Sequence, residues 1–473
     1  MPNLHVLILK KSFKKMAKYI IKNIQAVNEG KTFETDVLIN NNRIEKIAPL
    51  IQAPAGAIEI DGTGKFLLPG VIDDQVHFRE PGLTHKATIG SEAKAAVAGG
   101  VTSFMEMPNT IPNALTQELL EDKYVIASNS SVANYSFFMG TSNDNAEEVL
   151  KTNAKKQDIC GIKIFMGAST GNMLVDNYRT LDRIFSEAEV LIATHCEDER
   201  VIKKNLENLA GKTFGPEDHP IIRDSEACFQ SSFSAIQLAK MRNTRLHILH
   251  ISTARELQLF TNMLPLKDKR ITAEVCIHHL HFTADDYATL GYQIKCNPAI
   301  KSFENRDALW EALLDDRLDV IATDHAPHTM DEKGIFRNEN GQLQKKPGGI
   351  AYDHAHAGLP LVQFSLPLML GYVKQGKISM EKVVEKMSHA VAECFEIADR
   401  GYLREGYYAD LAIVDMQTEK TILPDHLLYK CAWSPLEGSR LPVVTHTFVN
   451  GNLVYEKGVV NDSVKGMRLK FSR

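Results

Sequence analysis

The stretch FLLPGVIDDQVHFREPG, residues 66–82, most strongly constrains what this chain can fold into. Its apolar run breaks at Pro69-Gly70 and turns polar within a few residues, which is typical of a buried strand emerging at the rim of a barrel. In parallel barrels the catalytic residues come from strand ends and the loops that follow them. We therefore expect catalytic residues at the end of this strand, where Asp73, His77, Arg79 and Glu80 lie.

Seven further apolar runs follow and alternate with helix-like stretches such as residues 90–100 and 224–241. The eight runs are GVIDDQVHF, TSFMEMP, NYSFFMG, GIKIFMG, VLIATHC, RLHILHIS, ITAEVCIHH and DVIATDHA. Eight strands, each followed by helical material, predict an α/β fold of the (β/α)₈ TIM barrel type.

The two ends of the chain share a different sequence pattern. Short β-rich pieces and turns fill residues 18–66 and return late, in ADLAIVDM and HTFVNGNLVYEKGVV. We predict that residues 16–66 and 400–473 pair into one small β-sandwich domain beside a barrel of residues 67–399. Residues 1–15 are expected to be either a tail or a mis-annotated start, since Met16 directly precedes the first strand-like pattern.

Charge and composition limit the classes of partner that the chain can bind. A formal charge of -5, from Lys+Arg 54 and Asp+Glu 59, gives no basic field for nucleic acid or an anionic membrane. No apolar run reaches the roughly 18 residues of a membrane span. The seven cysteines lack paired spacings, as expected in a reducing compartment. We expect a cytoplasmic homo-oligomer with a small-molecule substrate and no nucleic-acid or membrane partner.

Several of the eight runs end with a metal-binding or titratable side chain. Taken singly, a histidine or aspartate at a strand end is more often a surface or capping group, and a lysine in an apolar run usually snorkels. The carboxyl ends of barrel strands converge on one mouth, however, and imidazoles with carboxylates suit zinc. The sequence therefore predicts a zinc site from His77, Lys163, His195, His250 and Asp324.

The order of several motifs carries a resemblance to a known family. The strings VHFREPG, MPNT, GIKIF, ATHCED, LHILHIST, HHL, CNP and TDHAPH resemble the dihydroorotases of pyrimidine biosynthesis, within the cyclic amidohydrolase group. The resemblance covers residues 66 to about 360. It implies reversible cyclisation of N-carbamoyl-L-aspartate to L-dihydroorotate in de novo UMP synthesis.

The resemblance also implies a metal arrangement. Lys163 matches the lysine that is carboxylated in the family to bridge two zinc ions, with His195 and His250 on the second ion and His77 and Asp324 on the first. An apolar strand suits that chemistry because burial disfavours the ammonium form. The chain departs from the family at Gln75, where a histidine is usual. An amide oxygen is a weaker zinc donor than an imidazole, so the sequence leaves open whether one or two zinc ions bind.

Substrate contacts follow from the same resemblance. Arg79, Asn109 and His328 are expected to hold the substrate carboxylate, and His77 lies beside the substrate. Ring contacts are expected from Asn297 and from backbone groups at Gly348 and Gly349. Asp324 is the expected catalytic residue, a proton shuttle between the attacking water and the leaving nitrogen.

Two alternatives stay open. A dihydropyrimidinase or allantoinase would use the same metals on a substrate without that carboxylate, which Arg79, Asn109 and His328 argue against. A zinc-depleted scaffold for aspartate transcarbamoylase is kept open by Gln75, although the other metal-binding residues are all retained. Zinc content and turnover of dihydroorotate distinguish the three.

Overall fold

Parallel strands follow one another in chain order through the body of the molecule. The computed structural model describes residues 17–167 and 173–473, so the expectation for residues 1–15 lies outside the described residues. One sheet has the order β6-β7-β8 and another the order β14-β13-β12-β11-β10-β9. Every one of the eight expected runs contains a strand, and the run NYSFFMG contains two. The strands are β6 (Val71–Val76), β7 (Val101–Glu106), β8 (Asn134–Phe137), β9 (Met139–Gly140), β10 (Ile162–Phe165), β11 (Ile192–His195), β12 (Leu246–Ile248), β13 (Ile271–Cys276) and β14 (Val320–Ala322).

Contacts join the two sheets at both ends. Only Phe138 separates β8 from β9. Just after β14, His325 forms a parallel bridge with Val76 of β6, and its carbonyl accepts from the His77 amide at 2.7 Å. Side chains of β6 and β12, which are not hydrogen-bonded neighbours, also approach each other: Asp74 Oδ2 lies 3.3 Å from His247 Nε2. The α/β expectation with parallel strands is confirmed, and the strand order is the one a barrel requires.

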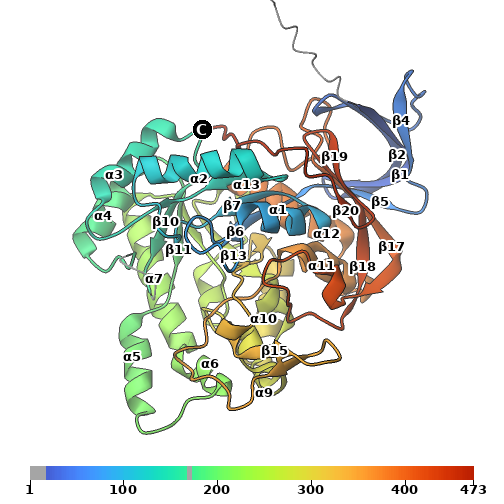
Figure 1. Cartoon of the computed structure of the whole chain (residues 1–473). Coiled ribbons are helices and arrows are strands. Elements are labelled where there is room, and N and C mark those ends of the chain that lie inside the picture. The colour runs from blue at the N-terminus through green and yellow to red at the C-terminus, as the bar shows by residue number, and fades with distance from the viewer. Residues whose placement is uncertain (1–16, 168–172) are drawn as a thin grey trace, which may run out of the picture.

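Helices lie around the outside of these strands (Figure 1). Polar caps set several boundaries; for example, Thr88 accepts from the Ser91 amide before α1, and Asp224 accepts from the Ala227 amide before α7. No described helix combines the length and apolarity needed to cross a membrane. The helices are α1 (Ile89–Ala98), α2 (Gln117–Ser130), α3 (Ala146–Leu150), α4 (Tyr178–Glu187), α5 (Glu199–Asn208), α6 (His219–Ile222), α7 (Ser225–Arg242), α8 (Ile277–His281), α9 (Tyr287–Leu290), α10 (Phe303–Leu314), α11 (Ser365–Lys374), α12 (Met380–Val384) and α13 (Ala390–Phe395).

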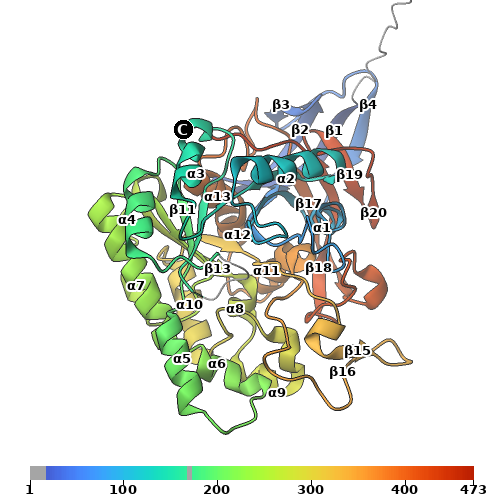
Figure 2. The ribbon, with the colours of Figure 1, turned by 60° about the vertical axis from the view of Figure 1, so that its left-hand side comes forward.

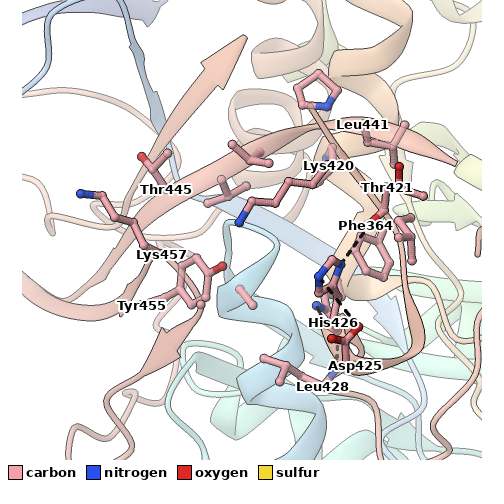
Figure 3. A pocket seen from close by; sticks show the side chains of 18 residues that line it. Phe364, Lys420, Thr421, Asp425, His426, Leu428, Leu441, Thr445, Tyr455 and Lys457 are labelled. Atoms are coloured by element: carbon pink, nitrogen blue, oxygen red, sulfur yellow. Dashed lines mark hydrogen bonds and ion pairs between the residues drawn. The ribbon is translucent and has the colours of Figure 1, made fainter. Parts of the chain in front are cut away.

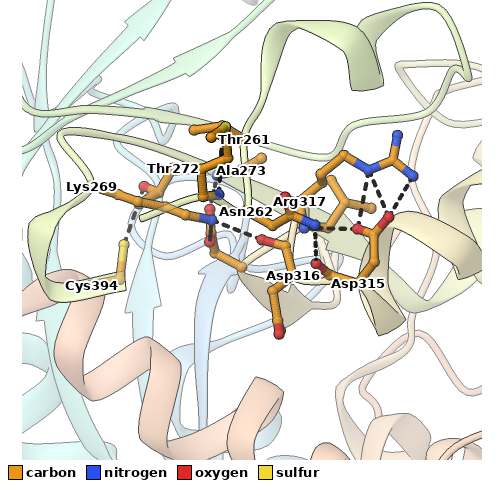
Figure 4. Close-up of polar contacts among 12 residues, drawn as sticks. Thr261, Asn262, Lys269, Thr272, Ala273, Asp315, Asp316, Arg317 and Cys394 are labelled. Carbon is orange, nitrogen blue, oxygen red and sulfur yellow. Dashed lines mark hydrogen bonds and ion pairs between the residues drawn. The ribbon is translucent and has the colours of Figure 1, made fainter. Parts of the chain in front are cut away.

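An ionic clamp fixes the amino ends of β13 and β14, opposite the ends that carry the predicted site. Lys269 donates from Nζ to the Asp316 carbonyl at 2.8 Å and to Asp319 Oδ1 at 2.6 Å (Figure 4). Asp319 Oδ2 in turn accepts from the Ala273 amide at 2.9 Å. Because the lysine and the aspartate are both buried, the paired charges stabilise this turn only while both are present.

The N- and C-terminal segments share one nine-stranded sheet with the order β20-β19-β18-β17-β5-β1-β2-β3, in which β4 also pairs with β1 (Figure 1). The two ends of the chain pair directly, since Pro69 of β5 pairs with Leu411 of β17. The expected division into two facing layers stays a prediction. The strands are β1 (Lys18–Asn28), β2 (Lys31–Asn40), β3 (Arg43–Ala48), β4 (Ala57–Asp61), β5 (Phe66–Pro69), β17 (Leu411–Thr421), β18 (Arg440–Val449), β19 (Asn452–Glu456) and β20 (Val459–Val460).

Two segments depart from their neighbours. The last residues of the chain leave the terminal sheet and run along the parallel strands, where Arg468 bridges to Tyr135 of β8. A hairpin of β15 (Ile335–Arg337) and β16 (Leu343–Lys345) projects from the body of the molecule (Figure 2). It occupies the glycine-bearing segment before residue 350.

Candidate metal centre and substrate pocket

A cavity of about 260 Å³ opens at the carboxyl ends of β6, β10, β11, β12 and β14. The structure brings ten of the twelve predicted site residues into its lining. They are Gln75, His77, Arg79, Asn109, Lys163, His195, His250, Asn297, Asp324 and His328. Residues from distant parts of the sequence therefore converge as the strand-end argument predicts.

One side of the cavity carries Lys163 on β10 with two imidazoles. His195 Nδ1 lies 2.9 Å from His250 Nε2, so the two ring nitrogens face a common point. Burial lowers the pKa of Lys163 to about 7, which makes a large share of its amine neutral near neutral pH. Burial also holds the pKa of His250 well below its usual value. Two imidazoles beside a buried amine form a donor set that suits a zinc ion.

Glu197 orients this side of the site, and the sequence reasoning did not single it out. Its Oε2 lies 3.1 Å from His195 Nε2 and 2.5 Å from Arg223 Nη1. Burial raises the pKa of Glu197, but Arg223 and His195 outweigh burial and bring it down to about 2. A carboxylate on the outer nitrogen fixes the tautomer of a metal-binding histidine and leaves the inner nitrogen free to coordinate. The signal was present in the ATHCED string, two residues after His195.

The opposite side is built from β6 and from the loop after β14. His77 Nε2 and Gln75 Nε2 both approach Asp324 Oδ1, at 3.0 and 3.1 Å. Asn109 Oδ1 lies 2.8 Å from His77 Nδ1 and so holds the ring with Nε2 toward Asp324. Gln75 thus presents its amide nitrogen, not its oxygen, to the shared carboxylate. It acts here as a hydrogen-bond donor.

Three of the site residues have left-handed backbone conformations. The φ angles are 69° at Arg79, 41° at His250 and 46° at Asp324. Such conformations cost on the order of 1–3 kcal/mol for residues other than glycine, and they persist where the surroundings enforce them. All three side chains point into the cavity, so the strained backbone coincides with the candidate site.

The end of the cavity predicted to bind the substrate carboxylate is cationic and largely buried. Arg79 donates from Nε to the Pro327 carbonyl at 3.1 Å, and its Nη2 lies 3.0 Å from His328 Nε2. Burial lowers the pKa of Arg79 to about 10, so the guanidinium stays charged at neutral pH, whereas burial holds the pKa of His328 well below its usual value. Lys86 lies 3.1 Å from His328 Nδ1 and was not predicted. Asn297 Oδ1 is buried without a hydrogen-bond partner among the described residues.

Gly348 and Gly349 are not brought to this cavity. Both are exposed after the β16 strand, where the Gly349 amide donates to the Lys346 carbonyl at 2.9 Å. Backbone at Ala357 and Gly358 lines the cavity instead. A Cβ at Gly358 would lie 2.3 Å from the Ala326 carbonyl oxygen, so only glycine allows this close approach. The Gly-Leu-Pro turn signal at 358–360 could have indicated it.

A larger cavity of about 360 Å³ lies elsewhere, between α11 and strands β17 and β18 (Figure 3). Its lining is mostly apolar. His426, its only lining imidazole, bonds within its own loop, at 3.1 Å from the Thr421 carbonyl. Size therefore does not identify the reactive site, and the convergent donors place the chemistry in the smaller cavity.

Over most of its length the chain is similar to known proteins. The model of the amidohydrolase family matches residues 66–454. A dihydroorotase of Pyrococcus furiosus is 32% identical over 453 residues, covering 94% of this chain and 96% of that protein. A dihydroorotase of Listeria welshimeri is 32% identical over 448 residues, covering 93% and 99%.

Solved structures show the same fold. The L-hydantoinase (dihydropyrimidinase) of Arthrobacter aurescens superposes with a TM-score of 0.86 at 26% identity, covering 94% of this chain and 98% of that one. The dihydropyrimidinase of Brevibacillus agri gives 0.84 at 24% identity, covering 96% and 100%, and indicates the fold alone. The chain therefore belongs to the amidohydrolase family, and its recognition as a dihydroorotase-type member is confirmed.

Proposed function

We propose that this protein is a zinc-dependent dihydroorotase that interconverts N-carbamoyl-L-aspartate and L-dihydroorotate. The observation that carries the proposal is the buried Arg79 beside the metal-binding donor set in one cavity. A guanidinium binds a carboxylate with two parallel hydrogen bonds. Dihydroorotate has one carboxylate on a cyclic amide, and the dihydropyrimidinase and allantoinase substrates lack it.

The residues present fit the implied metal ions. Lys163, His195 and His250 would hold one ion, and His77, Asp324 and the Lys163 carbamate would hold the other. Carbamate formation joins the neutral Lys163 amine to the carbon of carbon dioxide and releases one proton, and burial supplies that neutral amine. Bound zinc would polarise the reacting carbonyl and lower the pKa of water.

The remaining side chains bind the substrate and transfer a proton. Arg79 and His328 bind the substrate carboxylate, and the unpartnered Asn297 Oδ1 accepts from a ring N–H. In the hydrolytic direction Asp324 takes the proton from the attacking water and delivers it to the ring nitrogen as the C–N bond breaks. In the cyclisation direction the same carboxylate removes that nitrogen's proton and returns it to the departing hydroxyl. Contacts from His77 and Gln75 hold Asp324 in place.

The remaining organisation is also proposed. The two parallel sheets form one closed (β/α)₈ barrel over residues 67–399, supported by the Val76–His325 bridge. Residues 16–66 and 400–473 form the second domain, a β-sandwich. The seven free, buried cysteines support a cytoplasmic location. We also propose a homo-oligomer that binds neither nucleic acid nor membranes.

The test measures zinc content and turnover of the purified full chain with dihydroorotate, dihydrouracil and allantoin. We expect zinc-dependent turnover of dihydroorotate alone. Preferred turnover of dihydrouracil or allantoin would contradict the substrate assignment. A zinc-free protein without turnover would instead support the inactive scaffold.

A further inference from the structure

A second group of potential metal ligands lies outside the lining of the candidate cavity. Asp74 on β6, His247 on β12 and Glu274 on β13 each offer one ligand atom, and these atoms all lie within 4.8 Å of one another. All three side chains are completely buried. Three rigid strands therefore aim oxygen, nitrogen and oxygen at one point that solvent does not reach.

The contacts within this group are long. His247 Nε2 lies 3.3 Å from Asp74 Oδ2 and 3.7 Å from Glu274 Oε2. Among the described residues none of these three atoms has a hydrogen-bond partner, and neither does Asp74 Oδ1. Buried polar atoms without partners cost roughly 1–3 kcal/mol each, and more when charged. An ion bound among these four atoms would give all of them a partner.

Two of the three separations suit coordination of a zinc ion. Zinc bonds of about 2.0–2.1 Å to nitrogen and oxygen place neighbouring ligand atoms roughly 3.3 Å apart. The distances from His247 Nε2 to the two carboxylate oxygens, 3.3 and 3.7 Å, match this ligand-to-ligand separation better than they match hydrogen-bond lengths. Two carboxylates would balance the charge of a divalent ion, and a mixed imidazole–carboxylate set favours zinc over calcium or magnesium.

Outer contacts orient the three groups as a metal site requires. His247 Nδ1 lies 2.7 Å from Thr272 Oγ1, which can accept the imidazole N–H and so holds the ring with Nε2 toward the carboxylates. Glu274 uses its other oxygen, Oε1, to accept from the His250 amide at 3.0 Å. The second contact links the cluster to a residue of the candidate centre.

We propose that Asp74, His247 and Glu274 bind a structural zinc ion that is separate from the catalytic metals and ties β6 to β12 and β13. The ion lies between β6 and the neighbouring strands β12 and β13, and β6 is not a neighbour of either in the parallel sheets. It stabilises the folded chain and fixes the strand positions from which Gln75, His77 and His250 project. This inference does not depend on the substrate of the enzyme.

The variant Lys163→Ala isolates the cluster, because it removes the proposed bridge of the catalytic ions. After zinc loading of the full chain and dialysis, we expect Lys163→Ala to retain about one equivalent of zinc by mass spectrometry. Adding His247→Gln or Asp74→Asn should remove that equivalent. A folded Lys163→Ala protein without zinc would overturn the proposal, as would full retention of that zinc in both double variants.

His389→Gln is the matched control in the same background. His389 is also buried, but its ring contacts the Gly401 carbonyl and the Glu29 amide, far from the cluster in the sequence and on other elements. We expect the control to keep the retained zinc. Loss of zinc in the control as well would show a general folding effect and overturn the assignment to these ligands.

A direct measurement needs no variant. Anomalous scattering at the zinc edge from crystals of the zinc-loaded protein should give a peak among Asp74 Oδ2, His247 Nε2 and Glu274 Oε2. It should be separate from any peak at Lys163. Absence of density there, with density at Lys163, would overturn the proposal whether or not the variants fold, and it would leave the proposed enzymatic function intact.

Discussion

The two sides of the candidate metal centre are built differently. On the side of β10, β11 and β12, Lys163 stands beside two imidazoles whose nitrogens are 2.9 Å apart, and Glu197 with Arg223 orients the first of them. On the side of β6 and β14, His77 is the only imidazole among the predicted ligands, and Gln75 turns its amide nitrogen toward Asp324. One half is preorganised for a metal, while the other shares a single carboxylate among hydrogen-bond donors.

This difference separates metal binding from catalysis. Imidazoles held by a buried carboxylate bind zinc tightly because little reorganisation is needed on coordination. Asp324, in contrast, must exchange its contacts with His77 and Gln75 when it binds a metal or moves a proton. We infer that the first side holds the tighter ion and that the second side carries the proton transfer.

The most damaging change should be Lys163→Ala, since it removes the proposed carbamate that both sides share. We expect activity to fall on the order of 10³-fold or more, because Lewis-acid stabilisation is worth several kcal/mol. Zinc analysis should show loss of the catalytic ions, and short carboxylic acids should restore part of the activity. Lys386→Met, at another buried lysine that binds the Leu318 carbonyl, is the control and should keep its zinc. Normal zinc and turnover in Lys163→Ala would rule out the shared bridge.

The substitution Arg79→Met tests the substrate end next to the weaker side. Losing a desolvated charged contact to the carboxylate should cost on the order of 2–5 kcal/mol, or roughly 30-fold to several thousandfold in substrate binding. Inhibition by carboxylate-bearing and carboxylate-free ring analogues measures it, and only the former should weaken. Unchanged kinetics on dihydroorotate would remove the carboxylate role and favour a dihydropyrimidinase.

Gln75→His tests whether the weak side can be strengthened. Groups that only hydrogen-bond to metal ligands change metal affinity about 10–100-fold. A new imidazole ligand should therefore raise the affinity for the ion on this side by at least that much. During dialysis of the unmodified protein against a mild chelator, we expect one catalytic ion to leave first and activity to fall with it. Gln75→His should delay both losses. Simultaneous loss of both catalytic ions, with no protection in Gln75→His, would show that the two sides are equivalent.

The smallest expected effect is on the pH dependence of the metal-free protein. The folded pKa of Lys163, about 7, lies below the usual 10.5, so between these values the unfolded chain binds more protons. Stability should therefore rise with pH from about 7 toward 10.5, by up to about 1.4 kcal/mol per pH unit, relative to Lys163→Met. Urea unfolding in carbon dioxide-free buffer at pH 7 and 9 measures it. Parallel pH profiles of the two proteins would show that Lys163 is not desolvated.

The sequence predicted the strand ends better than it predicted the loops. Side chains at the ends of parallel strands, such as His77 and Lys163, have positions that the strand order dictates, so the cavity could be anticipated. Gly348 and Gly349 could not be placed, because the hairpin of β15 and β16 carries them away and its path depends on tertiary contacts. Glu197 was missed because a buried carboxylate is recognised as an orienting group only when its partner Arg223, on a separate segment, is seen beside it.

The terminal sheet has a consequence for how the chain is made. Strand β5 lies between β1 and β17, and Pro69 pairs with Leu411, roughly 340 residues later. At a synthesis rate of about 5–20 residues per second, the amino-terminal strands wait roughly 20–70 s for that partner. During this time β5 exposes unpaired backbone groups that can pair with other chains. Nascent chains should therefore be prone to aggregate until the last strands emerge from the ribosome.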